Sequence, residues 1–83
     1  MTATSLHNEK TMDIGDRLKA TREDNDLYQE DVAKQIGVTP RQIIRWEKNE
    51  TEMGINKLKE LCLIYGVSAD YILGLPRNLK WPR

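Results

Sequence analysis

The sequence predicts a single all-α domain of five short helices. Apolar residues recur three or four positions apart through most of residues 13–75, the spacing that gives a helix one apolar face. Glycine, proline or asparagine repeatedly interrupts this pattern, and no stretch alternates polar and apolar residues as a half-buried strand would. A chain of 83 residues has room for one small core but not for a second domain.

The composition is typical of a soluble globular protein, with 39% hydrophobic and 31% charged residues. The 13 basic and 13 acidic residues give a formal net charge of zero, so any surface that binds anions must be local. A single cysteine cannot form an internal disulfide, and the chain has no apolar run typical of a secretory signal or a membrane span. We therefore expect a cytoplasmic protein.

Residues 1–12 are polar and aperiodic, and we expect them to form a flexible N-terminal tail. The domain then covers residues 13–75. Residues 76–83 form a C-terminal tail with two prolines and three basic residues. The sequence leaves two roles open for Leu75, Leu79 and Trp81, which either pack back on the domain or complete a dimer surface with Ile72.

The first two helices are predicted at residues 13–24 and 28–37. Ile14 and Leu18 lie one turn apart in the first helix, which ends at the breaker-rich stretch DNDL. The second helix has acidic residues in its first turn and ends at Gly37, a residue suited to a left-handed C-cap. Its apolar stripe comprises Val32, Ala33 and Ile36.

Three local signals place a third helix at about Pro40 to Lys48. Thr39 is a good N-cap, Pro40 suits the first helical position, and Gln42 completes a capping-box pattern with Thr39. Val38 before the cap and Ile43 four residues after it are spaced for a hydrophobic staple.

The loop NETEMG follows, with Asn49 tolerant of a left-handed turn. The stretch INKLKELCLIYG predicts a fourth helix that ends at Gly66, and SADYILG predicts a fifth between a Ser68 cap and Gly74. One face of the fourth helix carries its apolar residues: Ile55, Leu58, Leu61, Cys62 and Tyr65.

The third helix has two faces of different character. Ile43 and Trp46, three residues apart, are predicted to point inward. The spacing i, i+3, i+4, i+7 places the following residues on one outward stripe: Arg41, Ile44, Arg45 and Lys48. A basic helix face is often only a solvated surface, so the residues in front of this helix decide how it is interpreted.

Those residues meet the steric requirements of a helix-turn-helix. Ala33 stands where two helices would cross closely, Gly37 lies in the tight turn, and Ile43 would fill the angle between the helices. In such a unit the second helix enters the DNA major groove. We therefore favour DNA contact over a solvated surface for the basic stripe.

At this point the sequence resembles a known family. The stretch YQEDVAKQIGVTPRQIIRWEKNE, followed by LKELCLIYGVSADYILGL, is similar to the phage-repressor (Cro/XRE-type) helix-turn-helix family over about residues 14–75. The resemblance implies a compact five-helix lambda-repressor-like DNA-binding domain, with its helix-turn-helix unit at residues 29–48. It also implies a sequence-specific regulator of transcription, with repression the favoured sign.

The resemblance assigns DNA-binding roles to individual residues. It gives Gln29 a phosphate contact, and it places Thr39, Pro40, Arg41 and Gln42 in the first turn of the recognition helix. Arg41 is the best candidate for a bidentate contact to guanine. Gln42 would read adenine only if its side chain is not held in the capping box. The outward residues that follow are Ile44 for a thymine methyl, Arg45 for a base or phosphate, and Lys48 for the DNA backbone.

The resemblance further implies a structural ion pair between Arg22 and Glu47. The chain departs from the family at Pro40, which offers no side-chain hydrogen bond where a polar base-reading residue is common. It departs again in the loop, where Glu50 and Glu52 replace basic residues and disfavour tight or salt-tolerant DNA binding.

We expect double-stranded DNA as the partner, in the form of a palindromic operator bound by a homodimer. The alternative is an interaction module, such as an antitoxin or a partner-binding domain, in which DNA affinity is secondary. Neither a cofactor nor a metal is expected, because His7 stands alone and Cys62 lies on an apolar helix face. No set of residues predicts catalysis, so we do not expect an enzyme.

Overall fold

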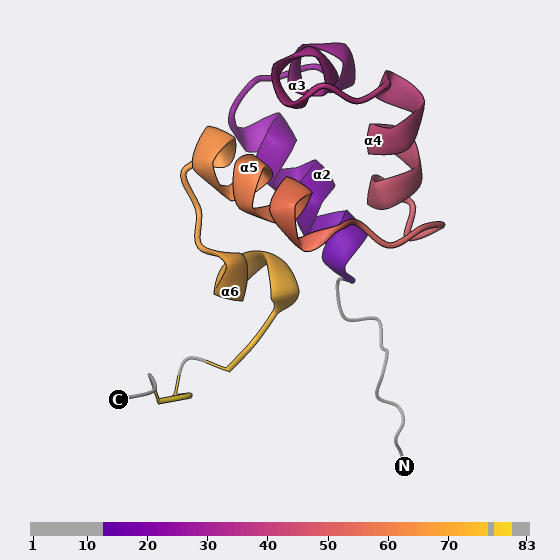
Figure 1. Ribbon diagram of the computed structural model, residues 1–83. Coiled ribbons are helices and arrows are strands. Elements are labelled where there is room, and N and C mark those ends of the chain that lie inside the picture. Colours follow the sequence, from indigo (N-terminus) through magenta and orange to yellow (C-terminus); the bar gives the residue numbers. More distant parts are fainter. Residues whose placement is uncertain (1–12, 77, 81–83) are drawn as a thin grey trace.

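The computed structural model describes residues 13–76 and 78–80, and the predicted tail at residues 1–12 and the predicted role of Trp81 lie outside this part. The described residues form five helices and no strand (Figure 1). They are α2 (Ile14–Asp24), α3 (Gln29–Ile36), α4 (Pro40–Glu47), α5 (Ile55–Tyr65) and α6 (Ala69–Leu73). The predicted all-α fold of five helices is therefore confirmed, and each helix lies close to its predicted span.

Buried apolar side chains from all five helices meet in one core. α2 packs against α4 and α6, and α3 packs against α4 and α5. Figure 1 shows the adjacent pair α3 and α4 at one end of the domain and α6 at the other. The buried apolar residues are Leu18, Val32, Ala33, Ile36, Ile43, Trp46, Leu61, Cys62, Tyr65 and Ile72.

The helix ends follow their local sequence signals. The Thr39 hydroxyl accepts a hydrogen bond from the Gln42 backbone N–H at 3.2 Å, and the Ser68 hydroxyl accepts one from the Tyr71 N–H at 3.2 Å. Gly37 ends α3 with a φ of 73°, in the left-handed region where a side chain would be strained. Asn49 has a φ of 61°, as the loop pattern predicted.

The predicted apolar faces need correction at three positions. Ile55, the first residue of α5, is 84% exposed although it lies on the predicted apolar face. Ile14, in the first turn of α2, is 42% exposed. Ile72 is fully buried in the core, so it is not available to a dimer surface, whereas Leu75 and Leu79 are exposed.

A close approach between α2 and the end of α4 depends on Gly15. A Cβ atom at this position would lie 2.5 Å from the carbonyl oxygens of both Trp46 and Glu47. The Gly15 backbone N–H also donates a hydrogen bond of 2.9 Å to the side-chain oxygen of Asn49. The absence of a side chain at Gly15 therefore fixes how closely α4 can pack on α2. Within the described part of the chain, no helix is both long and apolar enough to cross a membrane.

Candidate nucleic-acid interface

The helix-turn-helix unit consists of α3, a three-residue turn and α4. Ala33 is 1% exposed at the contact between the two helices, and Ile43 is 2% exposed. Val38 in the turn is half-buried and packs against the core that contains Ile43. The three steric requirements predicted for Ala33, Gly37 and Ile43 are therefore met, and they hold α4 in one orientation against the domain.

The two faces of α4 are sharply divided. Ile43, Trp46 and Glu47 are buried. The polar residues predicted on the outward side are exposed, whereas Ile44 lies half-buried at the edge of that face. The exposed side chains at the start and along the outer side of the helix are Thr39, Pro40, Arg41, Gln42, Arg45 and Lys48.

The cations on the outer face of α4 are available for an external anion. The ion pairs formed between described residues are Arg22–Glu47 and Lys57–Glu60, and neither involves Arg41, Arg45 or Lys48. Arg41 and Arg45 on α4 and Lys48 at its C-cap form no ion pair with another described residue, and they make a local positive surface on a chain of zero net charge. This surface is the strongest anion-binding feature of α4.

Gln42 is held by the capping box. Its side-chain oxygen accepts a hydrogen bond of 3.3 Å from the Thr39 backbone N–H, while its own N–H bonds the Thr39 hydroxyl. A bidentate contact to adenine needs both the oxygen and the nitrogen of the amide. Gln42 therefore offers only its NH₂ group while the box is closed.

A buried network fixes the inner side of α4. The Arg22 Nε and Nη2 atoms donate to the two oxygens of Glu47 at 2.8 and 3.1 Å, which confirms the ion pair that the family resemblance implied. Arg22 Nη1 also donates to the Leu27 carbonyl at 2.8 Å. The hydrogen bond to Glu47 raises the pKa of Arg22, so the guanidinium stays charged although it is buried.

Gln29 belongs to the same network. Its side-chain nitrogen donates to the Glu47 carboxylate at 3.1 Å, so the amide is oriented by α4. One N–H of this group remains, at the N-terminus of α3 where backbone N–H groups also point outward. The half-buried Gln29 side chain therefore links the buried network to the surface.

Sequence reasoning missed Tyr28. Its side chain is 75% exposed, and it lines a shallow concavity between the starts of α3 and α4 together with Gln29, Glu30, Pro40 and Arg22. The available signal was its place at the N-cap of α3, immediately before the first helical turn.

The remaining candidate groups lie away from this surface or are buried. Glu50 and Glu52 are exposed in the loop after α4. Cys62 is buried, and this burial raises the pKa of its thiol. Among the described residues, no three His, Cys, Asp or Glu side chains are grouped closely enough to hold a metal ion.

Comparisons with known proteins find the same architecture. A family model described as a helix-turn-helix domain matches residues 15–76. The crystal structure of the P22 c2 repressor in complex with synthetic operator 9T, in the presence of Tl⁺, is 33% identical with a TM-score of 0.72. That alignment covers 76% of this chain and 96% of the repressor chain.

Two further solved structures are also similar to this chain. The nuclear magnetic resonance structure of the P22 c2 repressor DNA-binding domain is 32% identical with a TM-score of 0.70, over 75% of this chain and 82% of that one. Apo-HppE is 24% identical with a TM-score of 0.66 over 72% of this chain but only 33% of its own, and this likeness concerns the fold alone. The search of curated proteins gave no match.

Proposed function

The chain belongs to the Cro/XRE-type helix-turn-helix family and is a DNA-binding transcription regulator, and we propose that it reads the major groove of duplex DNA with α4. One observation carries this proposal. The inner face of α4 is buried and fixed by the Arg22–Glu47 pair, whereas its outer face presents basic side chains without ion-pair partners among the described residues.

Base reading is assigned to the outer residues of α4. Arg41 is the second residue of the helix, where recognition helices contact base edges, and its planar guanidinium suits guanine. Arg45 lies one turn further and reaches a base or a phosphate. Ile44, half-buried at the edge of the face, is placed to touch a thymine methyl. Gln42 contributes the donors of its NH₂ group while its side-chain oxygen caps the helix.

Phosphate contacts are assigned to the two ends of the unit. The remaining Gln29 N–H and the first backbone N–H groups of α3 suit a phosphate oxygen, and the exposed Tyr28 lines the same concavity. Thr39 and Pro40 bring the chain to the DNA surface at the start of α4, and Lys48 meets the backbone at its end. These contacts fix the register in which Arg41 and Arg45 meet the bases.

We further propose that two copies bind a palindromic operator and act as a repressor by occupying it. The P22 c2 relative is itself a repressor solved with operator DNA. A chain that works by occupancy needs no catalytic group, and we therefore place this one among non-enzymatic regulators. DNA as the ligand, together with the buried Cys62 thiol, favours a cytoplasmic setting.

Selection from a randomised duplex pool tests this proposal, with wild type and Arg41→Ala each at about 50 and 200 mM salt. We expect a palindrome with half-site centres about 34 Å apart, weaker recovery at the higher salt, and a relaxed base preference at one position per half-site in Arg41→Ala. A failure to enrich any sequence at the lower salt would contradict DNA reading by α4. A single site without two-fold symmetry would contradict the dimer alone.

A further inference from the structure

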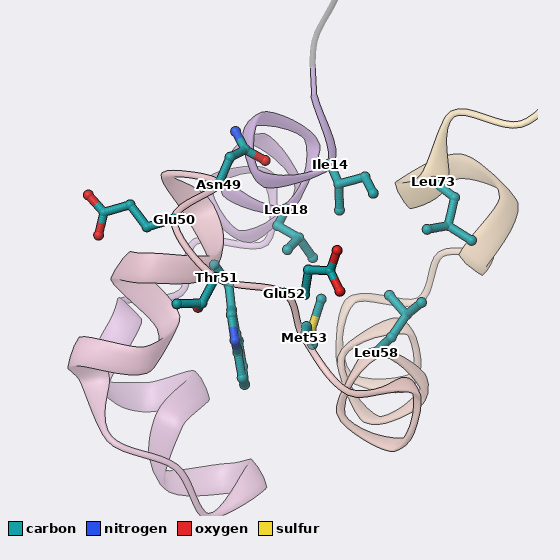
Figure 2. A pocket seen from close by; sticks show the side chains of 10 residues that line it. Ile14, Leu18, Asn49, Glu50, Thr51, Glu52, Met53, Leu58 and Leu73 are labelled. Carbon is teal, nitrogen blue, oxygen red and sulfur yellow. The ribbon is translucent and has the colours of Figure 1, made fainter.

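A cavity of about 330 Å³ opens beside the loop that follows α4 (Figure 2). Its walls come from α2, the end of α4, the loop, α5 and α6. Most of the lining is apolar, from Ile14, Leu18, Trp46, Met53, Leu58 and Leu73. The volume lies at the lower end of the range of small-molecule sites, about 300–1,000 Å³, so the cavity has room for one small ring with a short side arm.

Two carboxylates line the cavity, Glu50 and Glu52, and both are exposed in the loop after α4. In Figure 2 the Glu52 side chain lies between the apolar side chains of α2 and those of α5 and α6. Glu52 has no ion-pair partner among residues 13–76 and 78–80. The neighbouring Glu50 side chain points away from the cavity in the same view. The cavity therefore combines an apolar floor with two carboxylates, of which Glu52 lies among the apolar side chains.

We propose that this cavity binds a small hydrophobic cation, such as an ammonium group carried on an aromatic or branched alkyl body. The apolar body would leave water by packing against Leu18, Leu58 and Leu73, and the ammonium group would pair with Glu52. The Trp46 indole in the wall adds a surface that attracts cations. An anion of the same size would face repulsion from Glu52.

The site is separate from the DNA-reading face. Trp46 points to the inside of the domain, whereas Arg41 and Arg45 lie on the outer face of the same helix. A bound cation would nevertheless touch the last turn of α4 and Asn49, whose side chain holds Gly15. Ligand binding in the cavity does not depend on the assignment of DNA contacts, and its test needs no DNA.

Three probes that share a phenyl body test the proposal: phenethylammonium, phenethyl alcohol and hydrocinnamate. Each is titrated into the isotope-labelled full chain while backbone amide and tryptophan indole resonances are followed. We expect saturable shifts at Leu18, Trp46, Met53 and Leu58, with dissociation constants on the order of millimolar for ligands of this size. The cation should bind about two- to fivefold more tightly than the alcohol, and the anion should bind least.

Two variants that each remove one carboxylate charge test whether Glu52 pairs with the ammonium group. Glu52→Gln should bring the affinity for the cation down to that for the alcohol, while the alcohol binds as before. Glu23→Gln removes the same charge from an exposed side chain of α2 that does not line the cavity, and it should leave the ranking of the probes unchanged. Shifts that spread over the surface without saturation, or equal affinities of the three probes for the wild type, would overturn the proposal.

Discussion

Arg22 in α2 is buried and donates three hydrogen bonds within the domain, whereas Arg41 in α4 is exposed and has no ion-pair partner among the described residues. The two side chains carry the same charge in opposite surroundings. The Arg22 guanidinium is committed to Glu47, so it holds α4 in place, and the Arg41 guanidinium remains available to a ligand. The residue that positions α4 is therefore distinct from the one for which we propose DNA recognition.

Breaking the buried Arg22–Glu47 ion pair should have the largest effect on the free energy of unfolding. Glu47→Gln leaves the Arg22 charge buried without its counter-charge, and we expect it to lower the free energy of unfolding by about 3–5 kcal/mol. Urea unfolding followed by circular dichroism measures this loss.

The matched control removes both charges. Arg22→Met combined with Glu47→Leu leaves no unpaired buried charge, so the double variant should be clearly more stable than Glu47→Gln alone. A Glu47→Gln protein as stable as the wild type would show that the pair does not hold α4.

Gly15→Ala tests how closely α4 packs on α2. The added methyl group would meet two backbone carbonyl oxygens at 2.5 Å, so α2 and α4 must move apart, at a cost of about 1–3 kcal/mol in the free energy of unfolding. Gly54→Ala is the control, because a Cβ there meets no atom within 4 Å and the φ of −67° suits alanine. Equal stabilities of the two variants in urea would contradict the close approach.

A smaller effect should appear at high pH through Tyr65, which neighbours the buried pair. Burial and the Glu47 charge raise the pKa of Tyr65 to about 12, while Arg22 opposes this. Because the folded state holds the phenol proton more tightly than the unfolded state, its contribution is complete below about pH 10 and is lost as the pH rises toward 12. We expect the wild type to lose about 1 kcal/mol more stability than Tyr65→Phe between about pH 9 and pH 11. Parallel pH profiles of the two proteins would contradict this account.

Local sequence signals predicted most of what forms α4. The Thr39 cap, Pro40, the Gly37 turn and the inward position of Trp46 depend on neighbours in the chain or on helix periodicity, and each was confirmed. The Arg22–Glu47 pair joins residues far apart in sequence, and only the family resemblance implied it. The exposed position of the basic residues of α4 followed from the same periodicity that placed Ile43 inside.

Features that depend on how helices meet were not predictable. Periodicity identifies the apolar face of α5 but not how far neighbouring helices cover it, so the exposure of Ile55 on that face was not predictable. Gly15 looked like any helical glycine, because its role arises from the end of another helix. The bond between Gln29 and Glu47 and the cavity around Glu52 likewise arise between segments that no local pattern relates.

We propose that DNA recognition resides in exposed cations that do not support the fold. The direct measurement compares Arg41→Ala/Arg45→Ala with wild type, by urea unfolding and by affinity for the selected duplex, with Lys59→Ala on α5 as a control for loss of a surface cation. We predict a free energy of unfolding within about 0.5 kcal/mol of wild type and a loss of at least about tenfold in specific DNA affinity. Unchanged affinity for the duplex in a folded double variant would contradict the claim.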